Sequence, residues 1–158
     1  MPREPCAAQS ARASTPHDHG ACVTDCLARA EAVCAQTGRE LTPVRRRALE
    51  ILLEAHEALG AYDVLARLTE SGLGRQPPVA YRALAFLTEA GLAHRIERLN
   101  AYIACTHPGQ RHDPAFLICR DCGTVAEAEA DRPVVEAGGF AVEGTVVEAV
   151  GLCPACQP

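Results

Sequence analysis

The sequence contains no lysine, so its whole positive charge comes from 15 arginines, which stand against 20 acidic residues. A net charge of −5 does not by itself indicate binding to a polyanion such as DNA. The charge is uneven, however: residues 26–100 carry 10 arginines against 9 acidic residues, and residues 101–158 carry 3 against 8. The acidity therefore belongs to the C-terminal half, and the N-terminal half remains a candidate for nucleic-acid binding.

Long apolar runs are also missing. No apolar segment of roughly 7–15 residues that would serve as a secretion signal lies near Met1. The chain also has no apolar run of about 18 residues that could span a membrane. Nine cysteines without a secretion signal indicate metal or redox sites in a reducing compartment rather than a disulfide scaffold. We therefore expect a cytoplasmic protein with no membrane partner.

The stretch from His94 to Glu127 is dense in side chains that bind zinc. Its pair Cys119-Arg-Asp-Cys122 has one counterpart, Cys153-Pro-Ala-Cys156, and together they supply the four thiolates of a closed tetrahedral zinc site. The spacing between the pairs is longer than in zinc ribbons, but an intervening strand, helix and strand can return the second pair to the first. A redox dithiol is the alternative, although two pairs in one small domain suit one metal better. The remaining histidine, cysteine and glutamate side chains could form a second, mixed site.

The first half of the chain predicts four helices and a hairpin. Apolar periodicity and glycine stops indicate helices near 25–36, 42–55, 61–71 and 78–89, the second beginning with Thr42 as N-cap and Pro43 at the first helical position. Residues 92–97 and 101–105 predict two short strands joined at Leu99-Asn100. Helices followed by a hairpin are typical of a winged-helix DNA-binding domain, with 78–89 in the position of the recognition helix.

The second half predicts a hinge and a small second domain. Its expected elements are strand 116–119, strand 124–127, a helix near 132–137 and strand 141–150. A core this small rarely folds without a metal, a disulfide or a partner subunit. The fold class is therefore α+β: a disordered tail (1–24), an N-terminal winged-helix DNA-binding domain (25–105), a hinge (106–114) and a small C-terminal α/β dimerisation domain with a four-cysteine zinc site (115–158). In the tail, His17, His19, Cys22 and Cys26 could chelate metal, but such a segment is poorly preorganised.

The motifs reached so far resemble the ferric uptake regulator family, and most of all its zinc uptake regulator branch. The resemblance is carried by Leu41-Thr-Pro-Val-Arg, Ala61-Tyr-Asp, Pro78-Val-Ala-Tyr-Arg, Gly91-Leu-Ala-His-Arg, Phe116-Leu-Ile-Cys-Arg-Asp-Cys-Gly and Glu148-Ala-Val-Gly-Leu-Cys-Pro-Ala-Cys. It implies a zinc-sensing site formed by His94, Cys105, His112 and Glu127. His107 is the first substitute, because it shares a strand face with Cys105. It also implies two zinc ions per subunit, one structural and one regulatory, in a homodimer that binds double-stranded operator DNA and takes no small-molecule substrate.

Two departures from the family pattern bear on the metal and on DNA recognition. The iron-sensing branches carry a run of several histidines before the knuckle, where this chain has only Arg111-His112-Asp113-Pro114. Together with the thiolate, this disfavours sensing of iron or peroxide. The same fold sensing iron, manganese or peroxide is the nearest alternative. The segment Pro78-Val-Ala-Tyr-Arg also lacks the threonine that the family has before the valine.

The winged-helix context assigns four side chains to DNA. Tyr81 and Arg82 lie in the middle of the expected recognition helix, Tyr62 opens the preceding helix, and Arg45 is one of three consecutive arginines. Outside that context Arg82 would be an ordinary solvated charge.

The chain lacks the His-x-Glu and Pro-Cys-x-x-Cys pattern of zinc deaminases, which argues against an enzyme. The sequence thus predicts a zinc-responsive repressor, the family resemblance implies zinc uptake genes as its targets, and a zinc-stapled adaptor is a further alternative.

Overall fold

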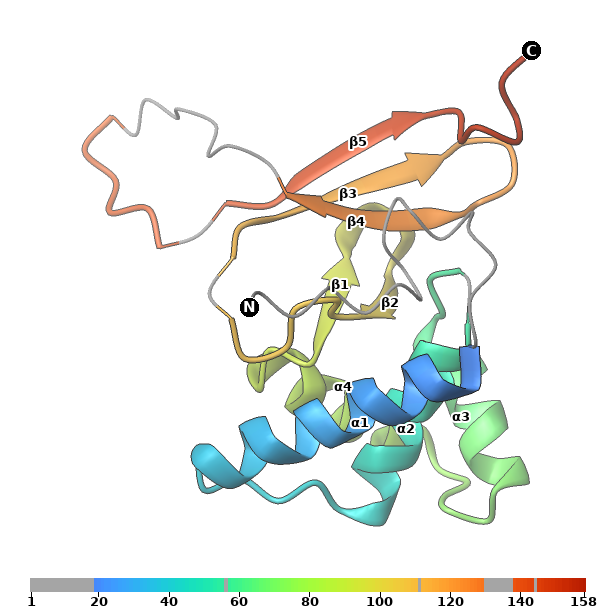
Figure 1. The fold of residues 1–158 in the computed structure, drawn as a ribbon, viewed down its shortest axis with the longest axis vertical. Coiled ribbons are helices and arrows are strands. Elements are labelled where there is room, and N and C mark those ends of the chain that lie inside the picture. The colour runs from blue at the N-terminus through green and yellow to red at the C-terminus, as the bar shows by residue number, and fades with distance from the viewer. Residues whose placement is uncertain (1–18, 56, 111, 130–137, 144) are drawn as a thin grey trace.

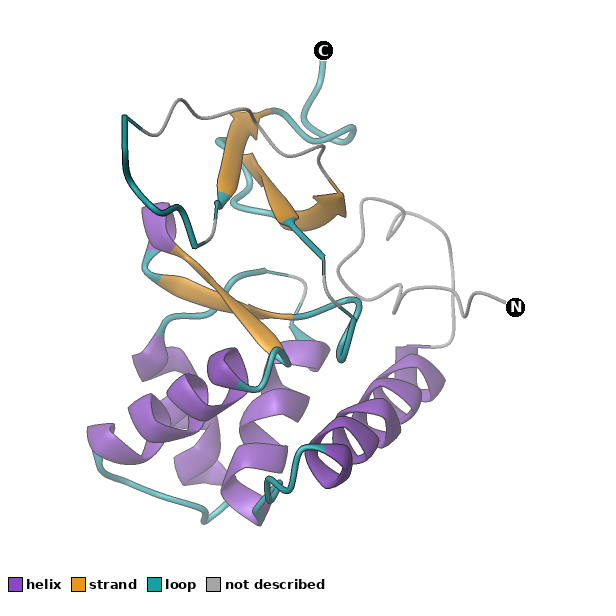
Figure 2. Cartoon of the chain, turned by 90° about the vertical axis from the view of Figure 1, so that its left-hand side faces the viewer, coloured by secondary structure: helices purple, strands orange, loops and turns teal. Residues whose placement is uncertain are grey.

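The structure, a computed structural model, describes residues 19–158 apart from 56, 111, 130–137 and 144. Its helices lie at one end, a two-stranded wing lies in the middle and a three-stranded sheet lies at the other end (Figure 1). The view turned by 90° shows the same order (Figure 2). The elements are α1 (His19–Gln36), α2 (Pro43–Glu54), α3 (Ala61–Glu70), α4 (Pro77–Glu89), β1 (Ala93–Ile96), η2 (Glu97–Leu99), β2 (Ala101–Ala104), β3 (Pro114–Cys119), β4 (Val125–Glu129) and β5 (Val147–Gly151).

The helical end confirms the second, third and fourth predicted helices. α2 begins at Pro43, although Thr42 occupies the N-cap position without a side-chain hydrogen bond. α2 and α4 each turn one apolar face inward, and the buried side chains they share in the core are Ala48, Leu49, Ile51, Leu52, Leu53, Ala80, Ala83, Leu84 and Leu87. Among the described residues, no helix combines the length and the apolar character that crossing a membrane requires.

The first helix is longer than predicted. α1 begins at His19, so the expected boundary of the disordered tail at residue 24 is wrong for the described residues 19–24. Cys22 and Val23 extend the apolar stripe of the helix and pack against the helical core, and Thr24 donates its hydroxyl to the Gly20 carbonyl within the same helix. Burying this apolar stripe stabilises the helix, although the polar composition of these residues suggested a disordered tail. The rest of the predicted tail, including His17, lies outside the described residues.

The wing follows the predicted hairpin. β1 and β2 are antiparallel, with Ala93 opposite Ala104 and Ile96 opposite Ala101. Asn100 has a φ of 47°, a left-handed conformation that Asn tolerates better than most residues, and it closes the expected turn. Leu59, just before α3, exchanges two backbone hydrogen bonds with Tyr102 and so joins the outer edge of the wing to the helices.

The three-stranded sheet has the order β4-β3-β5. β3 is antiparallel to β4 and parallel to β5. The predicted strand 141–150 is wrong in its first half, because 141–143 and 145–146 have no regular structure and β5 begins at Val147. β3 offers partners only along its own short length, and the pairing starts at Ala115 opposite Val147. The predicted helix near 132–137 lies outside the described residues.

The wing and the sheet share an apolar core. Ile96 and Ile103 of the wing are buried together with Phe116, Ile118 and Val125 of the sheet. The two predicted domains are therefore packed against each other, in addition to being joined through the segment predicted as a hinge. This packing sets the wing and the sheet in a fixed arrangement in which side chains from both can meet.

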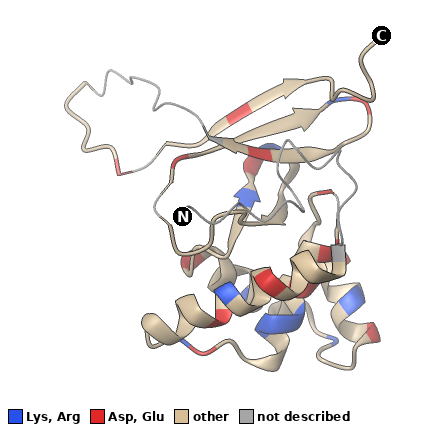
Figure 3. Ribbon diagram, viewed as in Figure 1, with Lys and Arg blue, Asp and Glu red and all other residues tan. Residues whose placement is uncertain are grey.

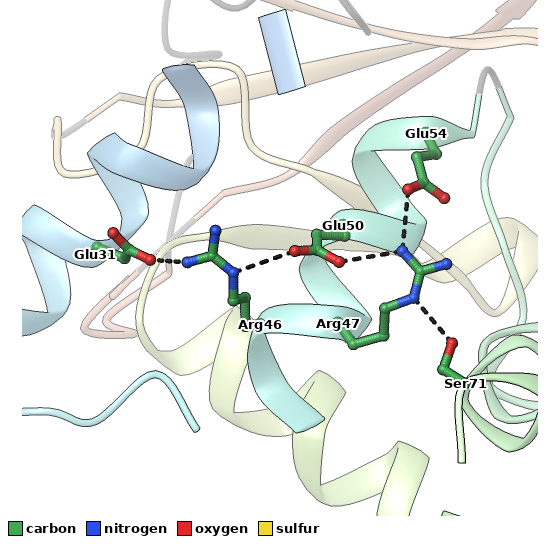
Figure 4. Close-up of polar contacts among 6 residues, drawn as sticks. All are labelled: Glu31, Arg46, Arg47, Glu50, Glu54 and Ser71. Atoms are coloured by element: carbon green, nitrogen blue, oxygen red, sulfur yellow. Dashed lines mark hydrogen bonds and ion pairs between the residues drawn. The ribbon is translucent and has the colours of Figure 1, made fainter. Parts of the chain in front are cut away.

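A chain of ion pairs connects the first three helices (Figure 4). Arg46 of α2 pairs with Glu31 of α1 and with Glu50, while Arg47 pairs with Glu50 and Glu54 and donates to the Ser71 hydroxyl after α3. Partly exposed pairs of this kind contribute about 0–1 kcal/mol each. Their consequence is local: both guanidinium groups are already engaged with acidic side chains of the same molecule.

The segment 106–110 also lies against α1. Gly109 has a φ of +80°, and a Cβ at this position would lie 2.6 Å from Cγ2 of Val33. Both the left-handed backbone and the contact require glycine here.

We predict that Gly109→Ala lowers the free energy of unfolding by more than the roughly 1–2 kcal/mol that a left-handed backbone costs. Gly72→Ala is the matched control, because Gly72 has a φ of +72° and open space around it. Chemical denaturation of the zinc-loaded proteins measures both changes. Equal losses for the two variants would show that the contact with Val33 contributes nothing.

Candidate metal centres

The first group of metal-binding side chains lies where two neighbouring strands end. β3 ends at Cys119, which lies opposite Gly151 at the end of β5 in the parallel register. Each strand continues into a short turn, and the two turns carry Cys122 and the pair Cys153 and Cys156. The structure thereby brings all four predicted cysteines together, with their sulfur atoms within 4.8 Å of one another. The parallel pairing of β3 with β5 closes the long gap between the two pairs.

The electrostatics of the four thiols favour a bound cation. Backbone N–H groups of Cys122 and Cys153 lower the pKa of Cys119 to about 6, and the Cys153 N–H lies 3.4 Å from its sulfur. Contact with the Cys153 thiol raises the pKa of Cys156 to about 12. Contact with the Thr124 hydroxyl also lowers the pKa of Cys122, so two of the thiols ionise readily while Cys156 beside them resists ionisation. A cation bound among the sulfur atoms would favour the thiolate form of Cys156. Four sulfur donors gathered within 4.8 Å of one another fit zinc.

The second group lies between the wing and the sheet. His94 is on β1, Cys105 directly follows β2, His112 belongs to the predicted hinge and Glu127 is on β4. One ligand atom of each lies within 4.8 Å of the other three. The group predicted from the family resemblance therefore converges, with ligands from four segments of the chain.

Two imidazole nitrogens of this group face the same carboxylate oxygen. His112 Nδ1 donates to the Gln110 carbonyl over 3.0 Å, which turns Nε2 towards Glu127 Oε1 at 2.7 Å. His94 Nε2 lies 3.2 Å from the same oxygen, and it is buried without a hydrogen-bond partner. A proton or a cation must lie between nitrogen and oxygen atoms this close. An unpartnered imidazole nitrogen beside a carboxylate and a thiol fits a zinc ion.

Thr106 is a functional residue that the sequence analysis missed. It is 3% exposed, and both its N–H and its hydroxyl donate to Glu127 Oε2 over 2.8 Å. Burial would raise the pKa of Glu127, but the close approach of His94 and the donors of Thr106 outweigh it and lower the pKa to about 2. Thr106 thus keeps the carboxylate charged and its other oxygen directed at the metal group, as the outer partners of metal ligands do.

Cys105 and His107 differ in their relation to this group. Burial, and secondarily the charge of Glu127, raises the pKa of Cys105 to about 12, so without metal it is a protonated thiol. His107, expected as a substitute ligand, is not one of the four converging residues. Its Nδ1 lies 2.9 Å from the Thr106 hydroxyl, whose proton goes to Glu127. His107 therefore supports Thr106 from outside the group.

The four predicted DNA-binding side chains lie at the helical end. Tyr62 and Tyr81 are 66% and 47% exposed, and their rings meet edge to face at 6.4 Å. Arg82 is exposed on α4 and donates to the Pro78 carbonyl. The Arg45 guanidinium lies 3.7 Å from the centre of the Phe86 ring and donates to the Glu40 carbonyl, which fixes its position. Arginines are concentrated at this end of the molecule (Figure 3).

Comparison with known proteins identifies close relatives. The zinc uptake regulation protein of Escherichia coli strain K12 is 40% identical over 137 residues, which cover 82% of this chain and 80% of that protein. The protein of the same name from Shigella flexneri matches to the same extent. A search against protein-family models gave no match.

Solved structures of zinc uptake regulators are also similar to this chain. A zinc uptake regulator complexed with zinc and DNA matches with a TM-score of 0.77 at 38% identity, covering 85% of this chain and 94% of that one. Holo XcZur matches with a TM-score of 0.73 at 36% identity, covering 82% and 95%. Apo XcZur, also at 36% identity and covering 85% and 97%, has a TM-score of 0.51. The arrangement of this chain is thus nearer to the holo than to the apo relative.

We predict that Cys153→Ser removes one zinc per subunit and unfolds the C-terminal sheet. Apparent zinc-binding free energies in small zinc domains are of order 10 kcal/mol, comparable with the stability of a whole domain. Zinc content and thermal melting measure the effect. Cys34→Ala is the control, since it removes a buried thiol of α1 that belongs to neither group. A Cys153→Ser protein with full zinc content and unchanged melting would contradict the assignment.

Proposed function

The chain belongs to the zinc uptake regulators of the ferric uptake regulator family, and on that premise we propose that it is a zinc-responsive transcriptional repressor of zinc uptake genes. It binds operator DNA as a homodimer when zinc occupies the group formed by His94, Cys105, His112 and Glu127. The observation that carries the proposal is the position of this group between the wing and the sheet. A ligand set drawn from both parts can link metal availability to the orientation of the DNA-binding helices.

Two zinc ions per subunit then have different tasks. The four cysteines all lie in the C-terminal part, so their zinc stabilises the sheet regardless of how the winged helix is placed. The other four side chains bind zinc fully only when the wing, the predicted hinge and β4 are in contact. Zinc at this second site supplies a cross-link between the two parts. One thiolate, two imidazoles and one carboxylate suit zinc better than iron or manganese, which prefer nitrogen and oxygen ligands.

The state described by the structure is proposed to be the one that binds DNA. Its TM-scores are 0.77 and 0.73 with relatives described as complexed with zinc and DNA or as holo, against 0.51 with the apo relative. Zinc then shifts the population of molecules towards this arrangement. The shift cannot exceed the difference in zinc affinity between this arrangement and the others. A coupling free energy of about 1–3 kcal/mol between zinc binding and DNA binding corresponds to roughly 5–150-fold tighter DNA binding.

DNA recognition is assigned to α4 and its neighbours. Arg82 and Tyr81 are exposed on α4, Tyr62 extends this surface from α3, and Arg45 contacts a phosphate from its fixed position beside Phe86. Arg46 and Arg47 are left out because acidic partners already engage them.

Dimerisation is assigned to the sheet. Leu117 of β3 and Val150 of β5 remain 43% and 45% exposed, which leaves apolar area for a second copy to cover. Two recognition helices related by a two-fold axis require a pseudo-palindromic operator. A regulator of this kind acts where the genome lies, so we place the protein in the cytoplasm and assign it no catalytic role.

Cys105→Ser is expected to separate the two zinc sites. The variant should keep the zinc of the four cysteines and remain dimeric, but operator binding should no longer respond to added zinc, because a serine hydroxyl is a poor zinc ligand. Zinc content, sedimentation and operator affinity with and without zinc test this expectation. A variant that still requires added zinc for full affinity would refute the sensory assignment.

Arg82→Ala is expected to weaken operator binding while zinc content and dimerisation stay unchanged. Loss of a base contact costs about 1–3 kcal/mol per subunit and relaxes the preference at one base pair, whereas loss of a phosphate contact lowers the salt slope by about one. Affinities for single-base operator variants at several salt concentrations distinguish the two roles. Arg67→Ala, on α3, is the charge-matched control. No change in either measurement would exclude Arg82 from the interface.

A further inference from the structure

One row of side chains crosses the three-stranded sheet and faces the wing. In the registers of the sheet, Phe116 of β3 lies opposite Glu127 of β4 and opposite Glu148 of β5. Phe116 is 1% exposed, its ring centre lies 5.4 Å from that of His94, and it is buried with Ile96 and Ile103 of the wing. The row therefore presents an apolar side chain flanked by two carboxylates to the winged-helix part.

The carboxylate of Glu148 holds the tip of the wing. Its Oε1 accepts a hydrogen bond from the Glu97 N–H over 2.7 Å, and its Oε2 accepts one from the Arg98 N–H over 3.2 Å. These two N–H groups open the short η2 turn, where backbone donors have no partner within the turn itself. A side chain of the C-terminal sheet thus satisfies backbone donors of the winged-helix part, about 50 positions earlier in the chain.

The two carboxylates of the row hold opposite ends of the wing. Glu127 accepts the Thr106 N–H at the base of the wing, where the metal group lies. Glu148 acts at the tip and belongs to neither metal group. The contact made by Glu148 therefore exists without zinc, and it can form only when the wing lies against the sheet.

We propose that Glu148 is a positioning residue whose contact with the wing tip sets how much zinc is needed to bring the protein into its DNA-binding arrangement. This inference rests on the proposed function, because it describes regulation of the same switch. With the wing released from the sheet, the Glu97 and Arg98 donors and the Glu148 carboxylate return to water. The contact thus favours the docked arrangement over the released one before any metal binds.

The proposal has a defined thermodynamic signature. If only the docked arrangement binds zinc at all four ligands and binds DNA, weakening the docking lowers both affinities by the same factor. Once zinc saturates the site and docking is complete, DNA affinity no longer depends on the contact. Loss of two hydrogen bonds to a partly exposed carboxylate supports a change of about tenfold. A residue needed only for folding would instead lower the melting temperature without linking the two affinities.

The experiment compares Glu148→Ala and Glu148→Gln with the parent, using full-length protein that retains the zinc of the four cysteines. The glutamine variant would keep one acceptor and lose the charge, so its effect should be intermediate. Glu143→Ala is the control, since it removes an exposed carboxylate of the segment before β5. Zinc affinity of the second site is measured with zinc alone against a chelator, and operator affinity is measured with and without zinc.

In Glu148→Ala we expect zinc affinity and zinc-free operator affinity to fall together by about tenfold, while zinc-saturated operator affinity stays within about twofold. Unequal changes, or a zinc affinity unchanged from the parent, would overturn the proposal. Hydrogen exchange at the Glu97 and Arg98 amides gives a direct readout: protection should persist in Cys105→Ser and be lost in Glu148→Ala. If the parent shows no zinc-dependent DNA binding, the proposed function fails, and the exchange result still decides whether Glu148 holds the wing.

Discussion

A carboxylate is costly to bury, and Glu127 is only 5% exposed beside an apolar cluster. Its charge persists because Thr106 donates twice to one oxygen while His94 and His112 approach the other. Those partners come from the wing and from the predicted hinge, so satisfying one carboxylate requires both to meet the sheet. The placement of the winged-helix part therefore depends on the contacts that satisfy Glu127. The same contacts bring the four side chains of the mixed metal group together.

We assign different purposes to the two cysteine pairs and the mixed group because they occupy different positions in the fold. The four cysteines lie within one sheet and its turns, where a bound metal can only stabilise that unit. The mixed group spans two units, where a bound metal also changes how they are held together. Apolar packing of Ile96 and Ile103 on Phe116, together with the Glu148 contact, already holds the wing against the sheet. Zinc therefore adds to contacts that already favour this arrangement, which lowers the ordering cost of binding.

Much of the architecture could be predicted from periodicity and from glycine and proline positions. Three helices, the hairpin and its turn at Asn100 follow local rules, since each element buries one face and ends at a residue suited to ending it. Local rules failed where a distant partner decided the outcome. α1 extends to His19 because Cys22 and Val23 find a core to pack on, and β5 is short because β3 offers it no more partners.

For the sites, the sequence by itself determined the chemistry: cysteine, histidine and glutamate side chains are types that bind zinc. The spacing of the two cysteine pairs grouped four of them, and the family resemblance implied the group of His94, Cys105, His112 and Glu127. Tertiary structure alone decided the residues that orient those ligands. Thr106 and Glu148 are ordinary polar residues in sequence, and they acquire their roles by accepting or donating hydrogen bonds across 21 and about 50 positions. It likewise decided that Arg46 and Arg47 engage acidic side chains while Arg82 stays exposed. A side chain carries its chemistry with it, but its partner is fixed only when the chain folds.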